Sequence, residues 1–62
     1  MEISDSQRQE LARLKSYFPY RIVWGAVNPA TGEWKASANP TMRQANDHAR
    51  KGWAVVVVKY NS

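Results

Sequence analysis

The chain contains no cysteine, only three glycines and three prolines, and five acidic residues among its 62. Without cysteine, neither a disulfide bond nor a thiolate metal site can add stability. A chain of this length buries only about 60% of the surface that its unfolded form exposes. We therefore expect one domain spanning residues 1–62, stabilised by aromatic burial, tight turns or self-association, with no room for a deep substrate cavity.

Long apolar runs are also missing. The most apolar stretch, 53–58, is far too short to span a bilayer. The amino end, residues 1–5, lacks the basic segment and the apolar run of a secretory signal. Because the absence of cysteine also suits a reducing compartment, we expect a cytoplasmic protein that does not contact a membrane.

Catalytic and metal-binding patterns are scarce. His48 is the only histidine, and Asp47 beside it would point elsewhere on a helix, so the pair forms no acid–base dyad and His48 is expected on the surface. One histidine and five scattered carboxylates do not provide converging metal ligands, and the isolated glycines form no phosphate-binding loop. We expect a non-enzymatic protein without a metal or other cofactor.

A helical pattern covers residues 4–17. It has a narrow apolar stripe formed by Leu11, Leu14 and Phe18. Ser4 or Ser6 suits the N-cap, with a glutamine three residues later, Gln7 or Gln9, completing a capping box. Pro19 ends the helix, because the residue before a proline is driven out of the α region.

Two strands are expected next, over 20–28 and 33–38, joined by a hairpin loop with Pro29 and Gly32. If Asn28 lies opposite Glu33, one face of the hairpin carries Val23, Gly25, Val27, Trp34, Ala36 and Ala38. A slip of one residue would instead group Ile22, Trp24 and Ala26 with Trp34 and Ala36, which separates apolar from polar side chains more cleanly. We favour the register set by the turn, which leaves large apolar groups on both faces.

A second helix is expected to begin with Asn39 as N-cap and Pro40 at the first helical position. Its inward stripe would be Met42, Ala45 and Ala49, packed against Trp34 or Trp53. Gly52 is expected to end the helix in the left-handed conformation.

The last strand, 53–60, is apolar on both sides, with Trp53, Val55, Val57 and Lys59 on one and Ala54, Val56, Val58 and Tyr60 on the other. A crossover through the second helix places it beside the first strand. The predicted architecture is α+β in helix-strand-strand-helix-strand order, with a three-stranded antiparallel sheet in order 2-1-3. The second helix covers one face, and the first lies beside it or across the sheet.

The net charge of +4 favours anionic partners. We expect an accessory or inhibitory protein that docks on a larger protein partner, for example in nucleic-acid machinery, and its size would suit a phage or mobile-element origin. Two surfaces are candidates. One is the polar face of the second helix, with Arg43, Asp47, Arg50 and Lys51. The other is the edge of the last strand, with Trp53, Val55, Val57 and Lys59, which would add a strand to a partner or pair two copies as a homodimer.

The alternative is direct nucleic-acid binding. Basic residues would contact phosphates, namely Arg21, Lys35, Arg43, Arg50 and Lys51. Trp24 or Tyr20 would stack on an unpaired base. The exposure of Trp24 separates the two hypotheses, because a buried Trp24 belongs to the core and an exposed one marks a binding face.

Overall fold

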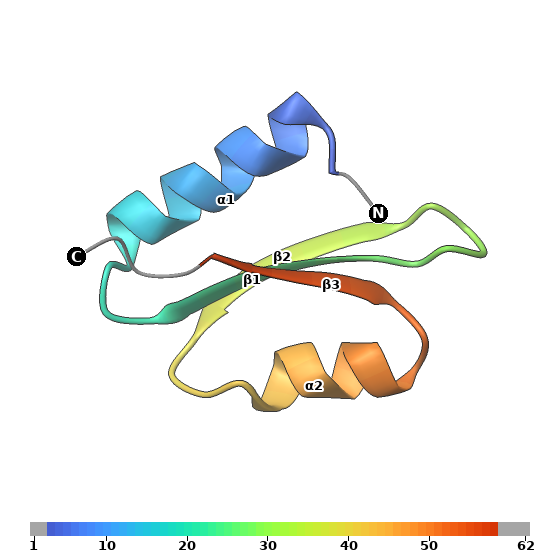
Figure 1. Ribbon diagram of the computed structural model, residues 1–62. Helices are drawn as coiled ribbons and strands as arrows, with labels where there is room; N and C mark the ends of the chain where they lie inside the picture. The colour runs from blue at the N-terminus through green and yellow to red at the C-terminus, as the bar shows by residue number, and fades with distance from the viewer. Residues whose placement is uncertain (1–2, 59–62) are drawn as a thin grey trace.

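A computed structural model of the chain describes residues 3–58. Helix α1 (Asp5–Tyr17) is followed by strands β1 (Ile22–Val27) and β2 (Trp34–Asn39), helix α2 (Arg43–Arg50) and strand β3 (Ala54–Val58). The strands form an antiparallel sheet in the order β2-β1-β3, as Figure 1 shows. The predicted α+β architecture and sheet order are confirmed.

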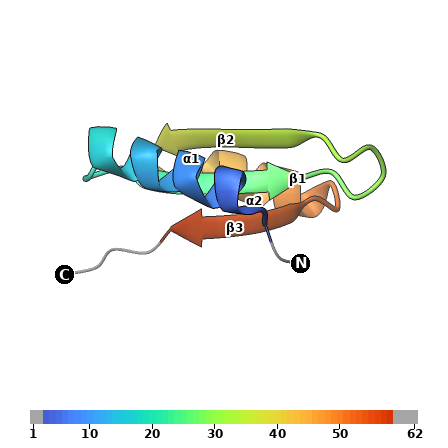
Figure 2. The same cartoon turned by 90° about the horizontal axis from the view of Figure 1, so that it is seen from above.

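The two helices lie on opposite faces of the sheet (Figure 1). Seen from above, α1 runs over β1, the central strand, while β2 and β3 form the two edges (Figure 2). Of the two placements expected for the first helix, the one across the sheet is therefore correct. Each helix covers one of the two apolar faces that the hairpin register leaves.

The start of α1 is determined by the capping box of Ser4 and Gln7. The Ser4 hydroxyl accepts a hydrogen bond from the Gln7 backbone N–H at 3.1 Å, and the Gln7 side chain accepts one from the Ser4 N–H at 2.9 Å. Two backbone donors at the helix start are thereby satisfied. The helix ends at Tyr17, just before Pro19.

The hairpin has the register that its turn predicts. Asn28 donates its N–H to the carbonyl of Glu33 at 2.8 Å, and Gly32, at φ 77°, donates to the carbonyl of Asn28 at 2.7 Å. Val27 lies opposite Trp34 and Gly25 opposite Ala36. The slipped register is therefore wrong, although it separated the faces more cleanly, because the loop geometry determines which residues pair.

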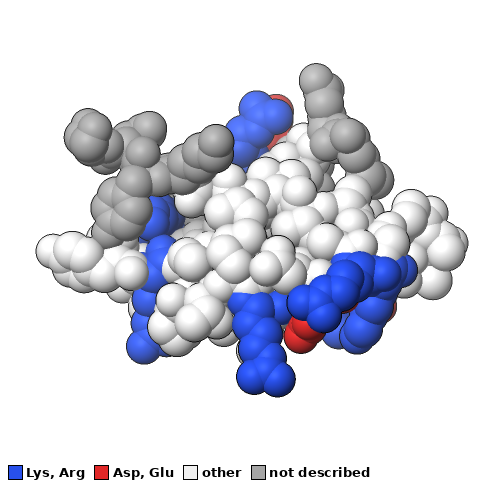
Figure 3. Space-filling model, turned by 60° about the horizontal axis from the view of Figure 1, so that its bottom comes forward, with Lys and Arg blue, Asp and Glu red and all other residues white. Residues whose placement is uncertain are grey.

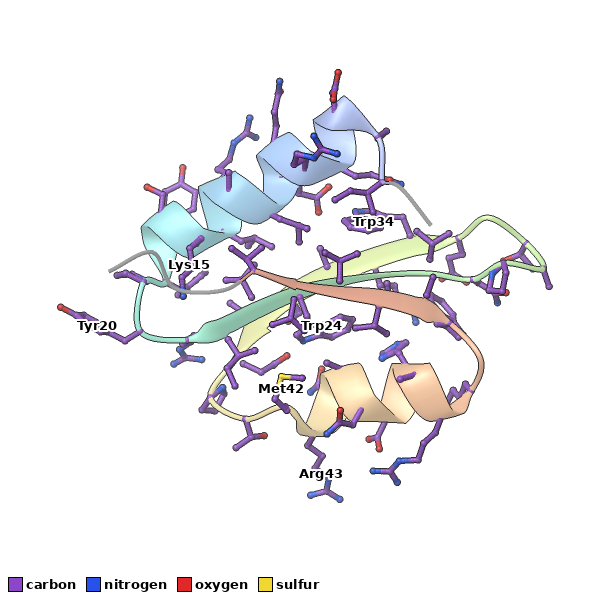
Figure 4. The ribbon with its side chains drawn as sticks, viewed as in Figure 1. Lys15, Tyr20, Trp24, Trp34, Met42 and Arg43 are labelled. Carbon is purple, nitrogen blue, oxygen red and sulfur yellow. The ribbon has the colours of Figure 1, made fainter. Side chains whose placement is uncertain are left out.

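The register places Trp24 and Trp34 on opposite faces of the sheet (Figure 4). On the α2 side, Trp24, Ala26 and Ala45 form a buried cluster, around which lie Met42, Trp53, Val55 and Val57. On the α1 side, the Trp34 ring lies over Gly25, and a Cβ at Gly25 would overlap it. Leu11 is buried within α1. The expectation that Trp34 packs against α2 is wrong, whereas Trp53 does belong to that cluster.

The sequence predicted Asn39 as the N-cap of the second helix, and this prediction is wrong. It is the last residue of β2, and its side-chain oxygen accepts a hydrogen bond from Trp24 Nε1 at 2.6 Å. The helix begins later, at Arg43, behind Met42. The physical reason is that a buried indole N–H needs an acceptor, and this tertiary partner engages the side chain that would otherwise have capped the helix.

The inward stripe of α2 also differs from its prediction. Ala45 is buried and Met42 is half-buried, but Ala49 is exposed. His48 packs inward instead, with its ring centroid 4.9 Å from that of Trp24 and 5.0 Å from that of Trp53. It is therefore a half-buried packing residue and not a solvated surface histidine.

The end of α2 and the last strand follow expectation. Gly52 has a φ of 91°, the left-handed conformation predicted for it. In β3, Val56 lies opposite Gly25 and Val55 opposite Ala26 of β1. All five residues of β3 are half-buried, whereas five of the six in β1 are buried. The valine strand is thus a sheet edge, and β1 is the centre of the fold.

Candidate interaction surfaces

The outer face of α2 presents the polar group predicted for it. Arg43, Arg50 and Lys51 are exposed, and Arg43 points away from the sheet (Figure 4). Asp47 lies among them, with its Oδ1 3.7 Å from Arg50 Nη2. The structure therefore places these four residues on or beside one helix, as a surface with an excess of positive charge.

The two hairpin cations lie elsewhere. Lys35 lies on β2, with its Nζ 3.9 Å from a Glu33 carboxylate oxygen and 5.6 Å from the centroid of the Trp53 ring. Arg21 precedes β1, and its guanidinium carbon lies 5.7 Å from the centre of the Phe18 ring. On the α2 side, Lys and Arg form separate groups, one of them mixed with acidic side chains (Figure 3). Of the five cations predicted to contact phosphates, three therefore come from α2 or directly follow it, one from β2 and one from the segment before β1.

Trp24 is a core residue, and its assignment to a binding surface is wrong. Its side chain is 2% exposed, and its N–H is bonded to Asn39. Stacking on a nucleobase requires an accessible ring face, whereas the Trp24 ring is covered by the sheet and by α2. Trp24 became buried because Ala26 and Ala45 leave room for an indole between β1 and α2.

Exposed aromatic side chains gather instead between α1 and β1. Tyr17 is 69% exposed, Phe18 42% and Tyr20 92%. Together with Arg21 they form a surface that we call the α1–β1 corner. Tyr20 projects away from the helices and the sheet (Figure 4). Phe18 was expected on the inward stripe of α1, but the helix ends at Tyr17 and leaves its ring outside.

Hydrogen bonds hold the backbone of this corner. The Arg21 N–H donates to the carbonyl of Phe18 at 3.1 Å. The ammonium group of Lys15 donates to the carbonyl of Arg21 at 3.0 Å. A loop that is already ordered loses less conformational entropy when it binds a partner. The backbone that carries the rings of the corner is therefore preorganised.

The sequence identified Tyr20 and Arg21 as candidates, but not the whole α1–β1 corner. The signal was available in the four residues Tyr17-Phe18-Pro19-Tyr20, where three rings surround the proline that ends a helix. Rings in a chain reversal cannot all point toward one core, so such a run favours exposure of some of them.

The edge of β3 is the other surface predicted from the sequence. Trp53, Val55 and Val57 lie on the α2 side and pack against the buried cluster there, so their side chains are only partly accessible. Lys59 lies outside the described residues. Within residues 3–58, no strand pairs with the outer edge of β3. A partner strand would therefore contact mainly the backbone of this edge, which is flanked by half-buried apolar side chains.

Residues 3–58 contain no group of three His, Cys, Asp or Glu side chains placed to hold a metal ion. In the same range, neither helix has the length and apolar character needed to cross a membrane. Comparisons of the chain with protein-family models, with curated proteins and with solved structures find no match. A function is therefore inferred from the surfaces described above.

Proposed function

We propose that the protein is a non-enzymatic binding protein that docks on a larger protein partner in the cytoplasm, as an accessory or inhibitory factor. The observation that supports this most directly is the α1–β1 corner, where three exposed rings lie close together in the chain and the Arg21 guanidinium lies over one of them, Phe18. Tyrosine and arginine are enriched at the energetic centres of protein interfaces.

The distribution of rings strengthens the argument. In the described part of the chain, the three tryptophans are buried or half-buried, whereas Tyr17, Phe18 and Tyr20 are all exposed. A chain of this size needs its rings for the core, so leaving three outside costs it apolar burial. Burying one such side chain against a partner is worth roughly 1.5–3 kcal/mol. Their adjacency distinguishes them from scattered surface apolar residues, which need no explanation.

Charge indicates the chemistry of the partner. Arg21 lies within the corner, Lys15 contacts its backbone, and the chain as a whole carries a net charge of +4. A complementary surface would combine an apolar groove for the rings with an acidic rim. The cations on α2 would then steer association without forming its energetic centre.

The test uses two matched double variants as baits in capture from the native host. Tyr17→Ser/Tyr20→Ser removes two rings from the corner, while Gln9→Ser/Ala12→Ser changes two exposed positions of α1 without altering charge. The partner recovered with the wild type is then titrated against each protein. We expect the corner variant to lose at least about tenfold in affinity and the control to bind normally. Equal binding by both variants would contradict the proposal.

Direct nucleic-acid binding is the second candidate, and the same corner favours it. A ring that is 92% exposed at Tyr20, next to Arg21, supplies a stacking platform and a phosphate contact. Labelled single- and double-stranded oligonucleotides titrated at two salt concentrations decide the matter. Affinity that falls steeply with salt, and that Tyr17→Ser/Tyr20→Ser abolishes, would support this candidate. No binding at low salt would remove it.

A further inference from the structure

Among the described residues 3–58, the outer edge of β3 lacks the usual protection of an edge strand. Residues Ala54–Val58 include no charged residue, no proline and no glycine. Natural edge strands avoid pairing with other chains by using charges, prolines, bulges or a covering element. All five residues are half-buried, so α1 and α2 leave part of the strand open on both faces.

The opposite edge, β2, is protected. It carries the exposed cation Lys35 in its first half, and on the same face Ser37 and Asn39 are polar. Pro40 follows directly after the strand and donates no backbone hydrogen bond. The two edges of this small sheet therefore differ in the features that suppress strand pairing, and β2 has them whereas Ala54–Val58 do not.

We propose that β3 pairs antiparallel with β3 of a second copy of this chain, so that three strands from each copy form one continuous sheet about a two-fold axis. Centring the two-fold axis on Val56, the middle residue of β3, sets the register. Val56 lies on the axis opposite its own counterpart, Val55 lies opposite Val57, and Ala54 opposite Val58. This register pairs every described residue of the strand.

Symmetry also keeps the two faces consistent. Residues directly opposite in an antiparallel pair share a face of the sheet. Val55 and Val57 both lie on the α2 side, and Ala54 and Val58 both lie on the α1 side. A shift by one residue would set α1-side positions against α2-side positions, which the pleat forbids. The strand is thus complementary to itself, as a two-fold interface requires.

A second copy fits this edge better than an unrelated strand because of the chemistry of the contact. The central pairs would be valine opposite valine, a favourable β-branched match. No charged side chain lies within Ala54–Val58, so no like charges would face each other directly along the pair. Association would also bury the half-exposed valines, which supplements a core that is limited by chain length.

Sedimentation equilibrium of the whole chain is the first measurement. We expect a mass twice that of the monomer at micromolar concentrations, falling toward the monomer on dilution. A mass equal to the monomer throughout this range overturns the proposal and leaves the edge to a strand from another protein.

Cysteine cross-linking tests the register, because the chain has no cysteine of its own. Val56→Cys places a thiol on the proposed axis. Ala36→Cys is the matched control, since Ala36 and Val56 flank Gly25 in the same row, on the same face, at the two edges. Partners directly opposite have Cα atoms about 4.5–5.5 Å apart, within the range that a disulfide spans. We expect Val56→Cys to form a disulfide-linked dimer at least about tenfold faster than Ala36→Cys. Equal rates for the two variants, both shown folded by near-ultraviolet circular dichroism, overturn the proposal.

Discussion

Each face of the sheet carries one tryptophan from the hairpin, and the two differ in burial and in the setting of their indole hydrogen bond. On the α2 face, Trp24 is 2% exposed and donates to Asn39 at 2.6 Å, in a partly buried position. On the α1 face, Trp34 is half-buried and donates to Glu10 at 3.1 Å, at the surface. A tryptophan is thus the centre of the buried cluster on the α2 face, whereas on the α1 face a tryptophan is half-buried at the edge of the packing.

Small neighbours explain both arrangements. Trp24 fits because Ala26 and Ala45 leave an indole-sized space between β1 and α2. Trp34 reaches across the sheet because Gly25 has no Cβ to meet its ring. The α2 face is thus built around a buried indole, whereas the α1 face combines three buried aliphatic side chains, Leu11, Val23 and Val27, with the close approach of Trp34 to Gly25.

The largest effect is expected for Trp24→Ala. Truncating a buried tryptophan costs about 3–5 kcal/mol, which is comparable to the entire net stability of a small single core. The variant should be mostly unfolded without denaturant, as seen by far-ultraviolet circular dichroism during urea titration. Trp34→Ala should cost clearly less. Equal losses from the two variants would remove the contrast between the faces.

Gly25→Ala is expected to destabilise the α1 face next. Its new methyl group would overlap the Trp34 ring, and overpacking of this kind costs about 1–3 kcal/mol. Adding Trp34→Leu should relieve most of that cost, because the obstructing ring is gone. Urea unfolding of both single variants and the double variant measures the coupling. Strictly additive losses would show that the glycine is needed for another reason.

Asn39→Ala tests the indole hydrogen bond on the α2 face. It leaves the Trp24 N–H without its acceptor in a partly buried place, which costs about 1–3 kcal/mol. Asn46→Ala, at an exposed position of α2, is the matched control and should leave the urea midpoint unchanged or slightly higher. A similar loss in both variants would contradict the role given to Asn39.

The smallest effect is expected at Glu10, the acceptor for Trp34 on the other face. Because this hydrogen bond lies at the surface, Glu10→Ala should change the free energy of unfolding by less than about 0.5 kcal/mol. Glu10→Gln keeps an acceptor and should match the wild type. A loss at Glu10 as large as that at Asn39 would reverse the order of the two faces.

Local signals made several elements predictable. Ser4 and Gln7 determine where α1 starts, and Gly52 marks where α2 ends. The loop with Gly32 determines the hairpin register. Each of these features depends on residues a few positions apart, so the chemistry is complete within a short segment.

The errors share a different cause. Asn39 has good N-cap chemistry, but it bonds to Trp24, 15 residues earlier in the chain. Ala49 was expected inside, but His48 packs there between two indole rings. Each outcome depends on which partner the folded chain brings near, which periodicity does not specify.

The sequence alone therefore determined the order of the elements, the turn, the pairing register and the position of the valine strand at an edge, because these follow from local backbone chemistry and chain connectivity. Only the tertiary structure decided that Trp24 is the core, that α1 lies across the sheet from α2, and that Tyr17, Phe18 and Tyr20 remain outside. The physical reason is competition. The chain has more aromatic rings than its small core can bury, and more polar side chains than there are buried hydrogen-bond partners. Tertiary packing decides which of them are buried.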